Sequence, residues 1–466
     1  MEKKQKRGKF SGSIGFVLAA AGSAVGLGNI WRFPYLAAKD GGGVFLLCYL
    51  VLALTFGFAL LTTEIAIGRK TGQSPLTAYK AIHPKMGWLG VFACIVPAMI
   101  LPYYCAIGGW VLKYMSIYIT GKGSQAVADG YFTSFITAQT EPVIWFVVYL
   151  ALTVIVVYRG VGNGIEKFST VLMPILILMI IGISVFSLTL KHTDASGVTR
   201  TGLDGFLVYV IPNFDGMTLK SFVNILMDAT GQLFYSVSVA MGIMITYGSY
   251  VKKETNLVKS VNQIEIFDTL VAFLAGLMIV PAVYTFMGTE GMATGPSLMF
   301  VSLPKVFEAM GGMGAFIAAV FFVMVAFAAL TSSVSIMEAI VSSCMDKFHI
   351  SRKKSSLIVS LYTAVVGLAV CLGYNQWYFE IPLPNGSVGQ LLDVLDYASN
   401  NVLMPVVAIA TCILIGWIVK PKTVIDEVTH GGFKFGRKGL YIVMVKVVVP
   451  LMLLFLLLQA LGVIQL

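Results

Sequence analysis

Long apolar stretches separated by short polar loops dominate the chain. Eleven of them approach or exceed the roughly 20 residues that a membrane-spanning helix requires. They cover residues 13–37, 43–68, 88–116, 142–158, 167–190, 221–247, 261–287, 312–344, 356–374, 391–418 and 440–464. The segment SLMFVSLPKVFEAM at 297–310 is apolar but too short to span, and is typical of an interfacial or re-entrant helix. The pattern predicts an all-α polytopic membrane protein with eleven transmembrane helices.

The first stretch is interrupted by small and polar residues in the sequence GSAVGLGNIWRFP at 22–34. Glycines alone would be explained by close helix packing. Here they occur together with Ser23, Asn29 and Arg32. Because non-helical backbone survives at membrane depth only where it is buried or lines a cavity, we expect this helix to unwind around a buried site.

The sixth stretch has a second interruption, GQLFYSVSVAMG at 231–242. The two interruptions occupy corresponding positions if spans 1–5 and 6–10 form an inverted repeat, an arrangement that indicates a transporter site at the membrane midplane. The unwound backbone would offer carbonyls to cations and amides to a carboxylate. The predicted organisation is a cytoplasmic segment at 1–12, five-helix repeats at 13–190 and 221–418, and an eleventh helix at 440–464.

Composition excludes several classes of protein. The chain is 58% hydrophobic and 12% charged, far below the roughly 25% charged residues of soluble domains. Its six cysteines include no CxxC pair and its four histidines lack metal-ligand spacing, so we expect neither a disulfide framework nor zinc or haem. An enzyme would need a nucleophile–base or metal set, and a channel would need a continuous polar pore; neither is evident. A sensor that binds without transporting stays open.

The basic residues predict topology rather than nucleic-acid binding. Most of the 32 Lys and Arg residues lie in the N-terminal segment and in the even-numbered connections. The positive-inside rule therefore predicts a multi-pass membrane protein with a cytoplasmic N-terminus and an extracytoplasmic C-terminus. The start MEKKQKRGKF followed by an apolar run is similar to a signal peptide, but the run is too long and includes Asn29 and Arg32.

Motifs along nearly the whole chain resemble the neurotransmitter:sodium symporter family. They are AGSAVGLGNIWRFPY in the first span, GGG and GR flanking the second, PYY in the third, GQLFYSVSVAMGIMITYGSYV in the sixth, LTSSVSIME in the eighth and LLDVLDY at the tenth. Eleven spans are similar to the bacterial branch of multi-hydrophobic amino-acid and tyrosine transporters, which implies a location in the bacterial plasma (inner) membrane. The resemblance implies a leucine-transporter-like fold and symport of sodium with a neutral, hydrophobic or aromatic amino acid by alternating access. It implies membrane lipid as surroundings, no nucleic acid, no organic cofactor and no obligatory oligomer.

The resemblance also implies two sodium sites. One would use the carbonyls of Gly22, Val25 and Ala328 with the hydroxyls of Thr331 and Ser332. Hard cations do take several oxygen ligands, although adjacent hydroxyls can also bond back to their own helix. The second sodium site would use Ala24, Asn29, Ser236, Asp268 and the substrate carboxylate.

The implied substrate site surrounds the same two interruptions. Amides of Leu27 and Gly28 and the hydroxyl of Tyr104 would bind the carboxylate. Carbonyls of Ala24, Tyr235 and Ser236 with the Ser238 hydroxyl would bind the ammonium group. The side-chain pocket would be formed by Ile100, Tyr235, Met241, Ser332 and Ile336.

Charged residues near the ends of the spans match the family's gates. The resemblance implies an outer gate of Arg32 and Asp396 and an inner gate of Arg7 and Asp346, supported by Phe10 and Tyr250; plain snorkelling is the alternative. Glu64 is expected to anchor first-span backbone.

Three positions depart from the family's pattern, and one of them is Met241, which stands in place of an aromatic residue. Asp268 supplies a negative charge one turn from where the leucine-transporter pattern has it, which predicts independence from chloride. Ala240 replaces a glycine in the sixth-span interruption.

Overall fold

The computed structural model describes residues 8–194, 196–292 and 296–464. In the first half the helices are α1 Ser13–Ala24, α2 Leu27–Lys39, α3 Gly43–Leu52, α4 Phe58–Thr71, α5 Pro75–Ile82, α6 Gly87–Ile119, α7 Tyr131–Thr137, α8 Glu141–Tyr158 and α9 Lys167–Leu188. π-Helical turns at Ala53–Gly57 and Val161–Glu166 join α3 to α4 and precede α9.

The second half is also helical, with more short elements between its long helices. Its helices are α10 Gly202–Val210, α11 Leu219–Ser236, α12 Ile243–Tyr250, α13 Leu257–Met287, α14 Leu303–Ala309, α15 Gly314–Phe348, α16 Arg352–Leu372, α17 Leu391–Asp396, α18 Met404–Ile413, α19 Lys422–Val428, α20 Lys438–Val443 and α21 Val449–Ala460. Two antiparallel hairpins pair β1 Lys191–Thr193 with β2 Thr199–Thr201 and β3 Ile381–Pro382 with β4 Val388–Gly389.

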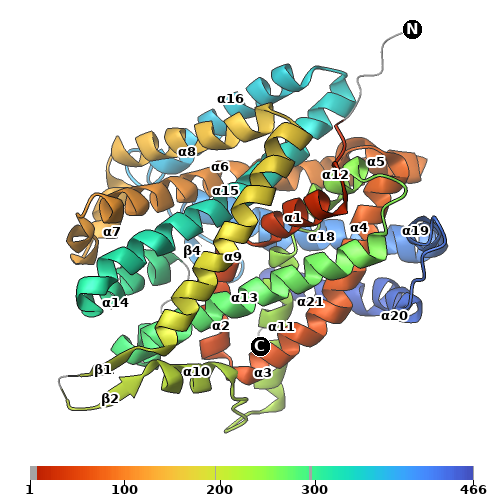
Figure 1. Cartoon of the computed structure of the whole chain (residues 1–466). Coiled ribbons are helices and arrows are strands. Elements are labelled where there is room, and N and C mark those ends of the chain that lie inside the picture. The colour runs from red at the N-terminus through yellow and green to blue at the C-terminus, as the bar shows by residue number, and fades with distance from the viewer. Residues whose placement is uncertain (1–7, 195, 293–295, 465–466) are drawn as a thin grey trace.

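The elements between the long helices lie at two opposite ends of the molecule. Figure 1 shows α7, α10, α14 and the β1–β2 hairpin at one end, and α5, α19 and α20 at the other. The apolar segment 297–310 forms a π-helical turn at Leu298–Ser302 followed by α14, as a short helix outside the spans.

The long helices agree closely with the predicted spans. In the described part of the chain, nine helices are long and apolar enough to cross a membrane, and the pair α1–α2, bent by 56°, is a tenth candidate. The remaining predicted span, 221–247, is divided between α11 and α12. The fold class is confirmed, whereas the count of eleven spans stays a prediction.

The interrupted helices lie at the centre of the bundle. α1 packs against α9, α13 and α15, and α12 packs against α4. The close approach of α4 and α12 depends on glycine: a Cβ on Gly68 would lie 1.9 Å from the Ile245 carbonyl oxygen, and one on Gly248 would lie 2.3 Å from that of Ile65. On the periphery, α9 and α16 expose apolar side chains such as Leu178 (70% exposed) and Leu361 (65%), as expected of surfaces that face lipid.

Candidate functional site

The interruption between α1 and α2 brings backbone carbonyls close to a hydroxyl of α15. α1 ends at Ala24, Val25 and Gly26 have extended backbone, and α2 begins at Leu27. Ser332 Oγ lies 3.1 Å from the Ser23 carbonyl oxygen, 3.3 Å from that of Val25 and 3.5 Å from that of Gly22. α1 has ended at this point, so these carbonyls have no amide of a continuing helix to accept from.

Thr331 completes this oxygen cluster from the neighbouring position of α15. Its Oγ1 donates to the Ala328 carbonyl at 2.9 Å, and a Cβ built on Gly22 would lie 3.3 Å from the Thr331 Cβ. The five oxygens expected at the first sodium site are therefore close together. Rotating the two hydroxyl hydrogens outward would leave five oxygen lone pairs for a hard cation.

A buried carboxylate lies beside the start of α2. Asp268 on α13 is 0% exposed. Its Oδ1 accepts hydrogen bonds from Ser236 Oγ at 2.6 Å and Asn29 Nδ2 at 3.1 Å, and its Oδ2 accepts one from Tyr49 Oη at 3.2 Å. Gln232 on α11 donates to the Gly28 carbonyl at 3.2 Å. An anionic oxygen cluster of this kind can bind a cation and offset its charge.

The interruption between α11 and α12 spans residues 237–242 and has an unusual backbone. Ser238 and Ala240 adopt positive φ angles of 54° and 62°, as does Gly242 at 72°. The Ala240 amide donates to Glu64 Oε1 at 2.6 Å, and Ser238 Oγ donates to the Ser23 carbonyl at 3.0 Å. We expected Glu64 to anchor the backbone of the first span. Its carboxylate instead accepts the Ala240 amide of the sixth span, which the loop 237–242 presents to α4.

One cavity lies between the two interruptions. Its lining includes all eleven residues expected at the substrate site: Ala24, Leu27, Gly28, Ile100, Tyr104, Tyr235, Ser236, Ser238, Met241, Ser332 and Ile336. Ser23, Gly26 and Asn29 complete it, of which sequence reasoning left out Ser23 and Gly26, although both belong to the interrupted segment. The cavity is about 20 Å³, room for a single water, so a larger occupant requires its walls to move.

A larger cavity of about 340 Å³ lies on the side of the expected outer gate. Arg32, Tyr235 and Asn400 are among its lining residues. Asp396 accepts hydrogen bonds from Tyr103 Oη at 2.9 Å and Asn400 Nδ2 at 2.6 Å. Among the described residues, the ion pairs within 4 Å do not include Arg32 with Asp396.

Close contacts join the elements on the opposite side. The Phe10 amide donates to the Tyr250 carbonyl at 3.2 Å, and the Phe10 ring packs edge-on against Tyr247 and Tyr250. Tyr250 Oη donates to Glu338 Oε1 at 2.5 Å, and Arg352 donates to both oxygens of Glu338 at 2.6 and 2.7 Å. The site is therefore covered on this side and more open on the other.

The expected inner gate is only partly visible. Arg7 lies outside the described residues. Asp346 Oδ2 accepts a hydrogen bond from the Ser74 amide at 2.7 Å. Glu166 contacts the first described residues: it accepts the Ser11 amide at 3.0 and 3.1 Å and the Ser11 hydroxyl.

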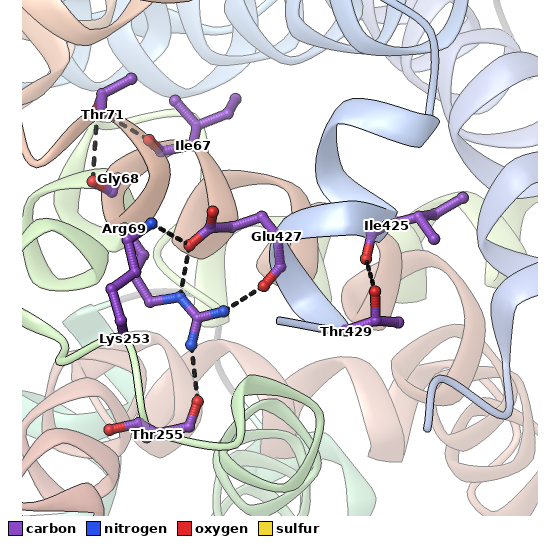
Figure 2. Close-up of polar contacts among 9 residues, drawn as sticks. All are labelled: Ile67, Gly68, Arg69, Thr71, Lys253, Thr255, Ile425, Glu427 and Thr429. Atoms are coloured by element: carbon purple, nitrogen blue, oxygen red, sulfur yellow. Dashed lines mark hydrogen bonds and ion pairs between the residues drawn. The ribbon is translucent and has the colours of Figure 1, made fainter. Parts of the chain in front are cut away.

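A charged cluster that sequence reasoning missed joins three segments on the covered side. Figure 2 shows Arg69, at the end of α4, between Glu427 of α19 and Thr255 of the α12–α13 connection. Arg69 Nε donates to Glu427 Oε1 at 2.8 Å and Nη1 to the Thr255 carbonyl at 2.7 Å, while Lys253 pairs with the same Glu427 oxygen at 2.7 Å. The Gly-Arg pair at 68–69, which flanks the second predicted span, is the sequence feature that could have indicated this cluster.

The charges of these residues suit ions and zwitterions rather than transition metals. Among the described residues, no group of three His, Cys, Asp or Glu side chains could hold a metal ion. Backbone carbonyls and hydroxyls are instead the donors that Na⁺ takes at broken helices.

Comparison with known proteins gives matches over almost the whole chain. The sequence profile of the Sodium:neurotransmitter symporter family matches residues 7–129 and 131–465. The sodium-dependent transporter YhdH of Bacillus subtilis (strain 168) is 34% identical over 99% of both chains. The human sodium- and chloride-dependent GABA transporter 2 is 26% identical over 92% of this chain and 76% of its own.

A solved structure also matches. The crystal structure of MhsT in complex with L-phenylalanine has a TM-score of 0.84 and 30% sequence identity, and the match covers 98% of this chain and 100% of MhsT.

Proposed function

Since the chain belongs to the sodium:neurotransmitter symporter family, we propose that it moves a neutral, hydrophobic or aromatic amino acid across the membrane together with two sodium ions. The observation that carries this proposal is the single cavity between two interrupted helices, with an oxygen cluster on either side. Such helix ends present amides to a substrate carboxylate and carbonyls to cations.

In this proposal the residues bind the substrate carboxylate, the substrate ammonium group and two sodium ions. The Leu27 and Gly28 amides and Tyr104 would hold the substrate carboxylate; Tyr104 Oη lies 3.5 Å from the Leu27 amide nitrogen. Ser236 and Ser238 would receive the ammonium group. Gly22, Val25, Ala328, Thr331 and Ser332 would form one sodium site, and Ala24, Asn29, Ser236 and Asp268 the other.

The side chain of the substrate would meet Ile100, Met241 and Ile336. Met241 has an unbranched thioether side chain that adapts to different shapes, so it can make room for a medium aliphatic or an aromatic group. The complex of the relative MhsT with L-phenylalanine supports this range. A thermal-shift screen of the twenty amino acids with and without sodium should give a sodium-dependent shift for this class; shifts for charged amino acids instead would contradict it.

The outer cavity supports entry past Arg32 and Asp396. We propose that this pair closes over the bound substrate, and that Asp346 and the contacts around Phe10 and Tyr250 open on the other side. Counterflow exchange in proteoliposomes separates this alternating cycle from a channel or a binding-only sensor, because only a carrier exchanges labelled for unlabelled substrate.

We further propose that transport does not need chloride. A zwitterion with two sodium ions leaves a net charge near +2 in a medium of low dielectric constant, which is unfavourable. Ionised Asp268, accepting hydrogen bonds from Asn29, Ser236 and Tyr49, would cancel one charge and bind the adjacent cation. The GABA transporter relatives, by their names, depend on chloride.

The test is uptake with gluconate in place of chloride. Wild-type uptake should be unchanged, and Asp268→Asn should weaken sodium-coupled uptake, with chloride giving partial rescue. Asp129→Asn is the matched control, since that aspartate is exposed and pairs with Lys305. Strong chloride dependence of the wild type contradicts the proposal.

A further inference from the structure

A long apolar groove opens on the outside of the bundle between α3 and α13. Its volume is about 630 Å³. Leu50 (45% exposed) and Leu54 (45%) line it from the α3 side, and Ile266 (62%) and Leu270 (44%) from α13. These exposed side chains belong to predicted membrane spans, so the groove faces the hydrocarbon of the bilayer.

The groove is enclosed on three sides. Val210 and Pro212, at the end of α10, close one end. Phe33 and Tyr49 form its floor, and both are 1% exposed. α10 packs against both α3 and α13, which keeps these two helices apart at this end. Figure 1 shows α10 beside α3 at this end of the molecule and α20 at the other.

The length of the groove matches a single acyl chain. Its lining on the α3 side runs from Gly43 to Leu54. At 1.5 Å per helical residue this is roughly 16 Å. A bilayer's hydrocarbon core is about 30 Å thick, so each leaflet supplies chains reaching about 15 Å.

Charge distinguishes the two ends of the groove. At the inner end Glu265 pairs with Arg437, whose Nη2 lies 3.0 Å from Oε2 and whose Nη1 donates to the Leu54 carbonyl at 2.9 Å. This pair neutralises the one acidic residue of the lining. Lys434 and Lys438, either side of Arg437, are exposed. The net positive charge at this end suits an anionic headgroup, because basic residues at the cytoplasmic membrane surface attract anionic lipids.

We propose that this groove binds an anionic phospholipid of the leaflet next to the loop 420–439. One acyl chain lies between α3 and α13 on Tyr49, and the phosphate lies at Lys434 and Lys438 beside Arg437. The site is separate from the central cavity, and the proposal does not depend on which substrate is carried.

The acyl-chain part is tested by native mass spectrometry of the purified full chain with phosphatidylglycerol. Leu50→Trp and Ile266→Trp place a bulky ring in the groove and should reduce lipid retention. Leu178→Trp on α9 is the control, because that leucine is 70% exposed and lies outside the groove. Having two groove variants on different helices keeps the test valid if one fails to fold. Retention equal to that of Leu178→Trp in either folded variant overturns the proposal.

The headgroup part compares phosphatidylglycerol with phosphatidylcholine of the same chains. The wild type should prefer phosphatidylglycerol, and Lys434→Gln with Lys438→Gln should weaken its retention roughly 30-fold, from the attraction of two lysines. Lys353→Gln with Lys354→Gln is the control, since these lysines are exposed at the start of another helix, α16. Equal retention of both lipids by the wild type, or equal loss in both double variants, overturns an anionic-lipid site.

Discussion

Both interrupted helices leave backbone polar groups without helical partners beside the central cavity, but the two breaks differ in backbone conformation. Between α1 and α2 the break is two residues long, and neither Val25 (φ −75°) nor Gly26 (φ −128°) is strained. Between α11 and α12 the break covers 237–242, with Ser238 and Ala240 in the left-handed region that non-glycine residues rarely adopt. The first break frees carbonyls without strain, whereas the second has to be held in place.

The partners of each break reflect this difference. The first is contacted mainly by hydroxyls of α15, which can turn toward a carbonyl or toward a cation. The second is fixed by the Glu64 carboxylate on the Ala240 amide and by Ser238 on the Ser23 carbonyl. We infer that the first break is chiefly the ion site and that the second is a structural support that also lines the cavity.

The largest effect should come from removing the hydroxyls at the first break. Thr331→Ala with Ser332→Ala takes two of the five oxygens from the proposed sodium site, so sodium-driven uptake should be abolished while the protein stays folded. Uptake of labelled substrate against sodium concentration measures this. Thr363→Ala is the control, since that hydroxyl bonds only within α16. Uptake with normal sodium dependence in the double variant would exclude the site.

Glu64→Ala should have the next largest effect, on the second break. It leaves the buried Ala240 amide unpaired, which costs about 1–3 kcal/mol of unfolding free energy. Glu64→Gln keeps an oxygen that can accept the same hydrogen bond and should lose less. Thermal unfolding in detergent, with uptake measured in parallel, compares the two. If the Ala and Gln variants are both as stable as the wild type, Glu64 does not stabilise the second break.

Much of this contrast was predictable from the sequence, and some of it was not. The interruption at 22–34 combines glycines with Asn29 and Arg32, a composition that a membrane helix tolerates only around a site. Eleven residues drawn from four separate spans line one cavity, as the motifs implied. The left-handed angle at Ser238 has no such local signal, whereas Ala240 stands where the family has a glycine, the residue that this angle favours.

Contacts between distant segments were the least predictable part. Arg69 and Glu427 are 358 residues apart, and their pairing depends on how the loop containing α19 folds back on α4. Glu64 was expected to anchor the first broken helix, whereas its carboxylate accepts the Ala240 amide in the break of the second, where α12 packs against α4. Periodicity identifies which residues face the interior, and only the packed structure says which of them meet.

Ala240→Gly should have a smaller and opposite effect. Glycine adopts φ 62° without the penalty of roughly 1–2 kcal/mol that a left-handed residue incurs. Its greater freedom in the unfolded chain offsets about 0.4–1 kcal/mol, so a net stabilisation of about 0.5–1 kcal/mol is expected. Ser238→Gly is the control: it relieves similar strain but loses the hydrogen bond to Ser23. A destabilised Ala240→Gly variant would show that the strain inferred at this position is not real.

The last prediction concerns the ionic contact between α2 and α11, one half of each broken helix. Lys39, the last residue of α2, pairs with Asp228 of α11 at 3.0 Å and lies 3.7 Å from Asp40. Burial, with the Asp228 carboxylate nearby, raises the pKa of Asp40 to about 7 from its ordinary 3.8.

Between about pH 4 and pH 7 the folded protein therefore keeps a proton on Asp40 that the unfolded chain has lost. Stability should fall as the pH rises through this window and level off above it. Asp40→Asn removes the titration, so relative to the wild type the variant should gain thermal stability between pH 5 and pH 8, and Asp129→Asn should not. Melting profiles of wild type and Asp40→Asn that run parallel across this range would mean that Asp40 is already ionised in the folded protein, and that Lys39 balances both carboxylates where the two broken helices meet.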